Sequence, residues 1–210
     1  MPAEITTATA PKPLSNSRKA GAKRARIVQA AIEIVNRRGF AQATMTEIAG
    51  SLGLRDAALY YYFPDKQSLI YAAHVQSLER FEALLAEAEA RGVDGFATLH
   101  GFVRRMLEDS NDNGAQLYFG DHSYLDDARR AAIDGWAARL TATLERFVAR
   151  GVADGSIVAC EPRLVVQLLL GMLIWLAKWT PDVEHLTVER LLAAIEASSL
   201  NGLRAQAPRF

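Results

Sequence analysis

The sequence predicts an all-α protein of about nine helices, and two observations support this. Half of its 210 residues are hydrophobic, and Leu, Ala, Glu and Arg recur at the three- and four-residue spacing of helices. Alternation of β-branched and polar residues, which would mark a half-buried strand, is almost absent. A chain of this length suits one or two domains with a sizeable core.

Charge divides the chain into two unlike parts. The formal net charge is zero, but residues 1–66 carry ten Lys or Arg against five Asp or Glu, a net of +5. Residues 67–210 carry fourteen against nineteen, a net of −5. The basic N-terminal part therefore predicts one face suited to phosphate, although the whole chain is neutral.

The N-terminal part contains one long and two short helical patterns. Residues 1–17 are rich in Pro, Thr, Ser and Ala and are predicted to be a disordered tail. A helix is expected over about 22–38, ending at Gly39. Two short apolar runs at 45–52 and 56–62 are separated by a turn at Gly53, the pattern of a helix-turn-helix. Thr44 is expected to cap the first of these short helices, with Glu47 completing a capping box.

The remaining chain predicts a second helical unit. Further helices are expected at about 66–90, 96–109, 126–153, 162–179 and after Thr187. The polar run 110–114 is predicted to be a loop, and the pattern is weak between 115 and 124. Helix 162–179 is apolar nearly all round, so it must be covered on several sides. The last two helices are therefore predicted to form a homodimer interface, because two helices from each subunit make a four-helix bundle.

The stretch Thr44–Leu69, TMTEIAGSLGLRDAALYYYFPDKQSL, resembles the DNA-binding half of the TetR family of bacterial transcriptional regulators. The match covers about residues 24–69, with the capped helix, the Gly turn, the Leu-Tyr pair, Phe63 and Lys66 in the family's order. The resemblance implies a DNA-binding domain over residues 18–66 and an effector-binding and dimerisation domain over 67–210. It also implies that the second helix of the motif enters the major groove of double-stranded DNA.

By this resemblance, ten residues are predicted to contact DNA: Thr44, Thr46, Arg55, Asp56, Ala57, Ala58, Tyr60, Tyr61, Tyr62 and Lys66. Arg55 is expected to pair with guanine, and the two alanines to touch thymine methyl groups. Asp56 either caps its helix, the preferred interpretation, or accepts a hydrogen bond from cytosine. Tyr61 and Phe63 are alternatively core residues, which is the preferred interpretation for Phe63.

The family also implies a pocket among the C-terminal helices whose occupant changes the separation of the two DNA-binding heads. The aromatic and apolar residues of that region, with a few polar groups, fit such a small-molecule site. The candidate lining is Phe102, Met106, Tyr118, Phe119, His122, Tyr124, Trp136, Leu140, Trp175, Lys178 and Trp179. Core packing is the alternative for each of them. The segment Trp175–Pro181 is similar in part to family members that sense lipid-derived acyl-CoA compounds, in which case Lys178 meets a phosphate or carboxylate. Its alternative role is a helix-end cation.

Enzymatic and metal-binding patterns are missing from the sequence. The four histidines are scattered, and no metal-ligand spacing or Gly-rich phosphate loop occurs. Asp121, His122, Asp126 and Asp127 form a local group that is either a solvated loop or a cation site. Cys160 is the single cysteine and has no local His partner. The chain is therefore predicted to be neither an enzyme nor dependent on a cofactor or metal.

No signal peptide is visible, and the longest apolar run, 164–177, is shorter than the roughly 20 residues of a spanning helix. A cytoplasmic protein without membrane contact is expected. The preferred interpretation is a homodimeric repressor that leaves a palindromic operator when a small, largely apolar effector binds. The alternatives are an activator without a small-molecule inducer and a helical dimeric interaction module.

Overall fold

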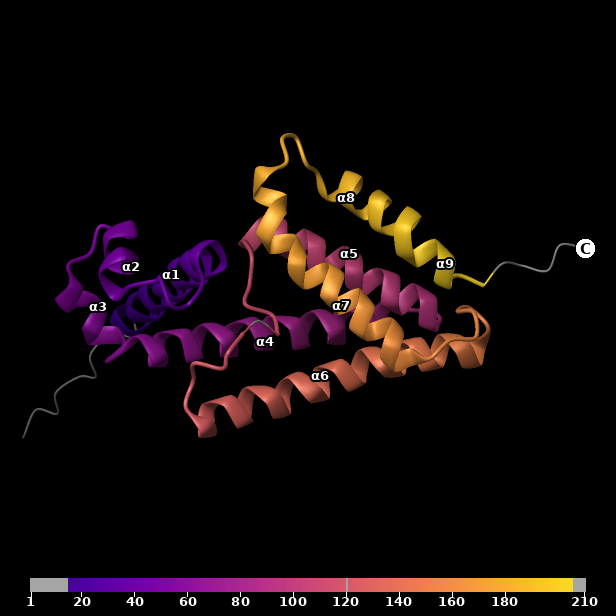
Figure 1. The fold of residues 1–210 in the computed structure, drawn as a ribbon, viewed down its shortest axis with the longest axis horizontal. Helices are drawn as coiled ribbons and strands as arrows, with labels where there is room; N and C mark the ends of the chain where they lie inside the picture. Colours follow the sequence, from indigo (N-terminus) through magenta and orange to yellow (C-terminus); the bar gives the residue numbers. More distant parts are fainter. Residues whose placement is uncertain (1–14, 120, 206–210) are drawn as a thin grey trace, which may run out of the picture.

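The computed structural model describes residues 15–119 and 121–205, which form an elongated assembly of helices (Figure 1). In chain order these are α1 (Ser15–Arg38), α2 (Met45–Ser51), α3 (Asp56–Tyr62), α4 (Lys66–Arg91), α5 (Gly95–Asn113), α6 (Asp127–Asp154), α7 (Pro162–Trp179), the 3-10 turn η1 (Thr180–Asp182), α8 (Val188–Ile195), the π-helical turn η2 (Glu196–Leu200) and α9 (Asn201–Leu203). Because α8, η2 and α9 follow one another without a break, the described residues contain eight separate helical rods. The all-α expectation is confirmed.

Local signals fix most helix ends where the sequence predicts them. Thr187 accepts a hydrogen bond from the backbone N–H of Arg190 and so caps α8, as expected. Two ends differ from the expectation. Helix α1 begins at Ser15, within the segment predicted to be disordered, whereas residues 1–14 lie outside the described part. Helix α5 continues through the polar run 110–113, where Asn113 Nδ2 donates to Asp109 Oδ1 one turn earlier, and ends at Gly114 with φ +79°.

Helix α4 connects two hydrophobic cores. Its first two turns place Leu69, Ile70 and Ala73 in an N-terminal core with residues of α1, α2 and α3. Its later turns place Leu78 and Phe81 in a C-terminal core with α5, α6, α7 and α8. The sequence-based domain division at Lys66 thus marks the start of α4, but the two cores meet further along it, between Ala73 and Leu78.

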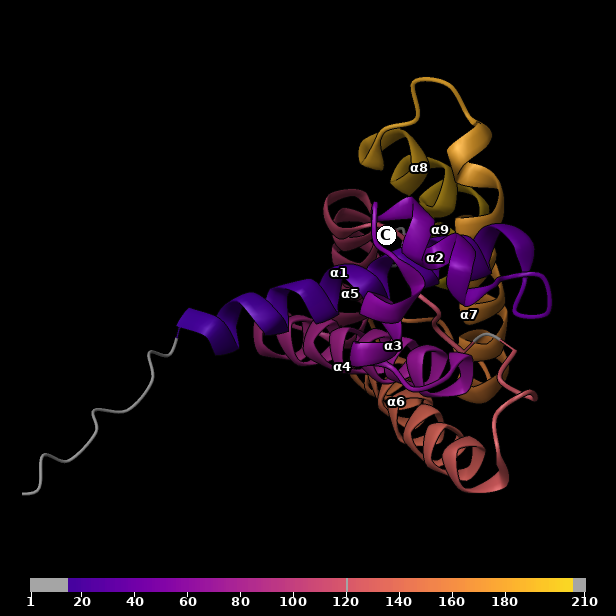
Figure 2. The ribbon, with the colours of Figure 1, turned by 90° about the vertical axis from the view of Figure 1, so that its left-hand side faces the viewer.

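The C-terminal helices are layered around α5. Helix α5 packs against α4, α6 and α8, and α6 also contacts α4 and α7 (Figure 1). Viewed from the N-terminal end, the first turns of α1 project away from the body (Figure 2). Among the described residues, one segment, Pro162–Asp182, is long and apolar enough to cross a bilayer. Its inner face, which includes Val166, Leu169 and Leu173, packs into the C-terminal core.

Candidate functional site

The helix-turn-helix has the local geometry that its sequence predicts. The Thr44 hydroxyl oxygen accepts from the backbone N–H of Glu47 at 3.1 Å, which caps α2. The carboxylate of Glu47 does not complete the capping box in this arrangement, because it pairs with Arg38 at 3.3 Å. Gly53 adopts φ +64°, a left-handed conformation that favours glycine and turns the chain toward α3.

Two buried side chains hold α3 against the rest of the N-terminal domain. Leu59 is fully buried, and Phe63, directly after the helix, is 2% exposed, as the core interpretation predicts. The guanidinium of Arg24 in α1 lies over the Phe63 ring, 4.7 Å from its centroid. A seven-residue helix is too short to be stable by itself, so these contacts fix the direction of its outer face.

The residues predicted to contact DNA lie on one continuous segment of surface, formed by the start of α2, the outer face of α3 and the start of α4. Thr44, Thr46, Arg55, Asp56, Ala57, Tyr60 and Tyr61 are exposed, whereas Ala58, Tyr62 and Lys66 are half-buried. Tyr61 is 82% exposed, so its alternative role as a core residue is wrong. Such a surface, bearing hydroxyls and an arginine on a short helix, suits a groove of double-stranded DNA.

Asp56 does not have the capping role that was expected of it. The N-cap position of α3 is Arg55, whose side chain makes no capping hydrogen bond. The carboxylate of Asp56 instead accepts from the hydroxyl of Thr46 at 2.6 Å. The bond forms because the turn brings the first residues of α2 and α3 together. Thr46 must exchange this bond if its hydroxyl is to donate to a phosphate.

Lys66 lies against an aromatic ring at the joint between the two domains. Its Nζ is 4.0 Å from the centroid of the Phe40 ring, and burial lowers the pKa of the Lys66 ammonium. Phe40 is half-buried and stacks on Tyr124. A contact of Lys66 with phosphate would have to replace or extend this arrangement.

A cavity of about 300 Å³ opens between α5, α7, α8 and the segment after α5. Its walls are mostly apolar, and a polar strip of side chains consists of Ser110, Asn111, Gln116, Thr180 and Thr187. Of the eleven residues predicted to line an effector pocket, Met106 and Tyr118 do so. These polar lining residues were missed because single amides and hydroxyls carry no periodic signal.

The other nine predicted lining residues lie outside this cavity. Phe102 and Leu140 are buried in the C-terminal core, and Phe119 and Trp136 pack against it. His122 and Tyr124 lie at the domain joint. Trp175 and Trp179 are exposed, on a side of α7 that faces away from the core. The helical turn of α7 explains this, since its cavity-facing residues are Leu173, Ile174, Leu176 and Ala177.

Lys178 also points away from the cavity. Its Nζ donates to the backbone carbonyl of Asn36, near the C-terminal end of α1. This is a favourable position for a cation, because the last carbonyls of a helix carry partial negative charge. The contact ties α7 to the DNA-binding domain and leaves no cation of α7 in the cavity lining.

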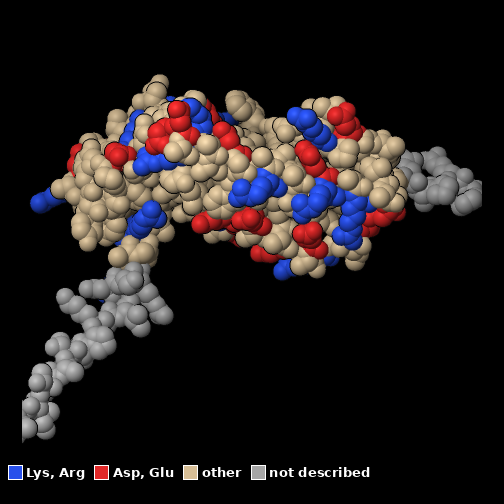
Figure 3. All heavy atoms as spheres, turned by 90° about the horizontal axis from the view of Figure 1, so that it is seen from below, with Lys and Arg blue, Asp and Glu red and all other residues tan. Residues whose placement is uncertain are grey.

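The acidic group near the domain joint is occupied by protein contacts. The Asp126 side chain caps α6, Asp127 pairs with Arg130, and His122 Nε2 lies 2.7 Å from Asp134 Oδ1. Within residues 15–119 and 121–205, no group of three His, Cys, Asp or Glu side chains is arranged to hold a metal ion. On the face shown in Figure 3, acidic and basic side chains are interspersed.

Comparisons with known proteins agree with this two-part organisation. Residues 27–73 match the family model for bacterial regulatory proteins of the tetR family, and residues 93–203 match the tetracyclin repressor-like C-terminal domain. The transcriptional regulator RutR of Escherichia coli K12 is 27% identical over 188 residues, 81% of either chain. UidR of the same strain is 27% identical over 191 residues, 87% of this chain and 89% of UidR.

Solved structures share the fold. AibR in complex with isovaleryl coenzyme A and operator DNA superposes with a TM-score of 0.73 at 21% identity, over 88% of this chain and all of AibR. The two family models together cover the helix-turn-helix and the C-terminal helices. The chain therefore belongs to the TetR family of bacterial DNA-binding transcriptional regulators.

Proposed function

We propose that this regulator is a repressor that binds a palindromic operator as a homodimer and releases it when a small, largely apolar effector fills the C-terminal cavity. The observation that carries the proposal is the exposed surface of α2 and α3, held rigidly on the helix α4 that also belongs to the C-terminal core. Arg55 would read bases, and Thr44, Tyr60 and Lys66 would contact phosphates. The bacterial cytoplasm, where the operator lies, is the proposed place of action.

The outer face of α7 supports the proposed homodimer. Leu164, Leu168 and Trp175 are 56%, 76% and 63% exposed, and with Gly171 they follow the 4-3-4 spacing of a helix-packing seam. Helix α8 exposes the small residue Ala193, and η2, which continues it, exposes Ala197. Pairing α7 and α8 with their copies would bury this apolar face in a four-helix bundle and present two DNA-binding heads related by twofold symmetry. Such a dimer requires a palindromic site.

The cavity supports a small-molecule effector. It is mostly apolar with a few neutral polar groups, the usual composition of a ligand pocket. AibR has been solved in complex with isovaleryl coenzyme A and operator DNA, so a protein of this fold binds an acyl compound. An effector changes DNA binding only if it favours one arrangement of the two heads over another. The proposed effector favours the arrangement that does not fit the operator.

Selection from a pool of random duplexes with the full chain tests the DNA-binding part of the proposal. We expect an inverted repeat bound by two subunits, and enrichment of no sequence or of a single half-site would contradict it. A reporter placed behind the selected site tests the direction of regulation. Removal of the regulator should raise expression, whereas a fall would identify an activator.

A further inference from the structure

The lining of the cavity restricts the chemistry of its ligand. None of the described residues that line it is Asp, Glu, Lys, Arg or His. A charged group taken into such a site would lose its hydration without gaining a partner charge. The part of the ligand that enters the cavity is therefore uncharged.

The volume sets a limit on size. A cavity of about 300 Å³ is at the lower end of ligand pockets, and it holds the volume of about ten liquid water molecules. A molecule of roughly ten to fifteen non-hydrogen atoms fits this space. A coenzyme A nucleotide is far larger, and its phosphates would find no cation in the lining.

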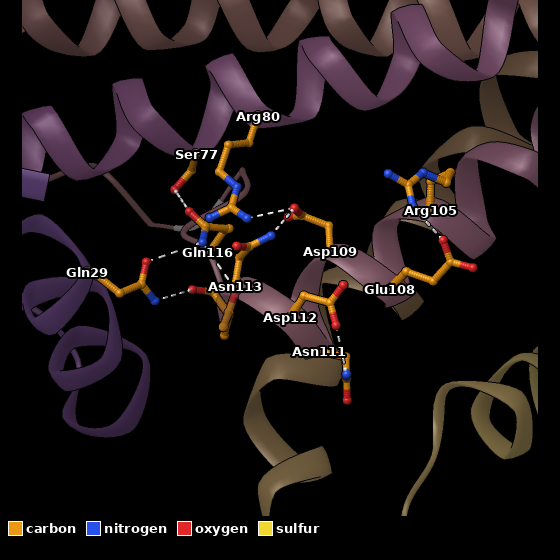
Figure 4. Close-up of polar contacts among 12 residues, drawn as sticks. Gln29, Ser77, Arg80, Arg105, Glu108, Asp109, Asn111, Asp112, Asn113 and Gln116 are labelled. Carbon is orange, nitrogen blue, oxygen red and sulfur yellow. Dashed lines mark hydrogen bonds and ion pairs between the residues drawn. The ribbon is translucent and has the colours of Figure 1, made fainter. Parts of the chain in front are cut away.

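Gln116 lines the cavity and also touches the DNA-binding domain (Figure 4). It is 4% exposed, and its carboxamide oxygen accepts from the Ser77 hydroxyl at 3.3 Å. Its Nε2 donates to the carbonyl of Gly114 at 3.2 Å and to Gln29 Oε1 of α1 at 3.5 Å. Its backbone carbonyl accepts from Asn36 Nδ2, also in α1, at 3.3 Å.

The residues on either side of Gln116 make the same connection. Gln29 Nε2 donates to the backbone carbonyl of Ala115 at 3.5 Å. Leu117 packs in the N-terminal core, whereas Tyr118 packs in the C-terminal core and lines the cavity. Residues 115–118 therefore contact the cavity on one side and α1 on the other. Movement of this segment therefore changes the wall of the cavity and the contact with α1 together.

The contacts between Gln29 and this segment are the ones most easily exchanged. Both are 3.5 Å long, at the outer limit for N–H···O hydrogen bonds, which are usually 2.9–3.0 Å. A better acceptor in the cavity can therefore compete with Gln29 Oε1 for a Gln116 amide hydrogen, whereas the bond from Gln29 Nε2 to the Ala115 carbonyl runs in the opposite direction and is kept. A ligand oxygen can make a shorter bond to Nε2 than Gln29 does. The hydrogen bond that α1 loses in exchange contributes little free energy, but it lies at the contact between α1 and the cavity wall.

We propose that the cavity binds an uncharged, largely apolar molecule with one carbonyl or hydroxyl oxygen, which accepts a Gln116 Nε2 hydrogen and so breaks the hydrogen bond from Gln116 to Gln29 of α1. The proposal rests on the proposed function, because it takes this cavity as the effector site. The ligand class follows from the uncharged lining of the cavity. The first step of signal transmission is assigned to the side chain of Gln116.

Ligand class is tested on the full chain with four probes: 2-decanone, decane, decanoate and isovaleryl coenzyme A. Titration calorimetry should show 2-decanone binding about tenfold more tightly than decane, which is the worth of one good hydrogen bond. Decanoate and isovaleryl coenzyme A should bind more weakly than the ketone. Tighter binding of either charged probe, or equal binding of ketone and alkane, would overturn the ligand class.

Gln116→Met tests the residue, since it keeps the volume of the side chain but removes the amide hydrogen. Its preference for the ketone over decane should fall to about one, while decane binding persists. Asn111→Ala is the matched control, because Asn111 also lines the cavity but bonds to Asp112 and not to α1. That control should keep the preference. A ketone preference unchanged in Gln116→Met would refute the role of Gln116.

Gln29→Ala tests transmission, because Gln29 lies outside the cavity lining and the substitution removes its two hydrogen bonds to residues 115 and 116 while the bond from Asn36 stays. It should bind 2-decanone within about twofold of the unaltered chain. The ratio of operator dissociation constants with and without ketone should fall toward one, whereas Asn111→Ala keeps it. Full coupling in Gln29→Ala would refute the transmission step. A chain that binds the ketone through Gln116 but no selected duplex would overturn the proposed function and leave the ligand class standing.

Discussion

The rings of Phe40 and Tyr124 are stacked in parallel across the joint between the two domains, with centroids 3.5 Å apart and planes inclined by 1°. Phe40 follows α1 in the DNA-binding domain, and Tyr124 precedes α6 in the C-terminal domain. The Tyr124 hydroxyl lies 2.9 Å from Nε2 of the buried His74 in α4. Lys66, Phe40, Tyr124 and His74 thus form one connected series of contacts from the DNA-binding surface to the interior of the joint.

Loss of the Tyr124 ring should loosen the joint. We expect Tyr124→Leu to lower the free energy of unfolding by about 2 kcal/mol, roughly 1 kcal/mol each for the aromatic pair and the hydrogen bond to His74. Tyr124→Phe keeps the aromatic stack and should lose only the contribution of the hydrogen bond to His74. Urea denaturation measures both variants, and equal stability of Tyr124→Leu and the unaltered chain would contradict an energetic role for the stack.

Stability should fall in mild acid because of His74. Burial, with a smaller effect from His122, lowers the pKa of His74 to about 4, against about 6.5 in the unfolded chain. Between these values the unfolded state binds more protons, so stability is greatest above pH 6.5 and decreases as the pH falls toward 4. The expected loss between pH 7.5 and pH 5 is about 2 kcal/mol. His74→Gln should show a correspondingly smaller loss by denaturation at the two pH values, and an unchanged loss would exclude His74 as the cause.

Lys66 is expected to contribute charge and no sequence preference. Lys66→Ala should weaken binding to all duplexes alike and reduce the slope of log affinity against log salt by about one. Arg139→Ala, in α6 and bonded to the carbonyl of Gly135, removes the same charge far from the helix-turn-helix and should leave the slope unchanged. Equal slopes for Lys66→Ala and the unaltered chain would show that the ammonium stays on Phe40 in the complex.

Arg55 is expected to carry sequence preference. If its guanidinium pairs with a guanine, Arg55→Ala should cost about 1–3 kcal/mol on the selected operator and relax the preference at one position of each half-site. Binding-site selection repeated with the variant provides the measurement. Recovery of the same motif with the same stringency would remove Arg55 from the set of base-reading residues.

Leu168 lies in the middle of the exposed stripe on α7. Leu168→Glu would place a carboxylate in the proposed dimer interface, so sedimentation should show monomers at concentrations where the unaltered chain is dimeric. Operator affinity should fall when the dimer is lost, because a monomer binds only one half-site. Val93→Glu is the matched control, since Val93 is 84% exposed at a site away from α7. A dimeric Leu168→Glu variant would mean that another face pairs the subunits.

The amino-acid sequence by itself determined the features that depend on neighbours in the chain. Periodic apolar residues predicted the bounds of α3 and α7, Pro162 marked the start of α7, and Gly53 marked the turn of the helix-turn-helix. The exposed outer face of α3 follows from its apolar residues, because a short helix anchored by Leu59 has a single possible outer face. These features need no information from distant residues.

Tertiary structure alone decided which side chains meet across long separations. The bond from Thr46 to Asp56 depends on the crossing of two helices, and the stacking of Phe40 on Tyr124 depends on the approach of the two domains. The cavity lining depends on the rotation of α7 about its axis. Gln116 meets Gln29 across 87 positions of sequence. Periodicity tells which face of a helix is apolar, but the partner of that face is fixed only when all the helices pack together.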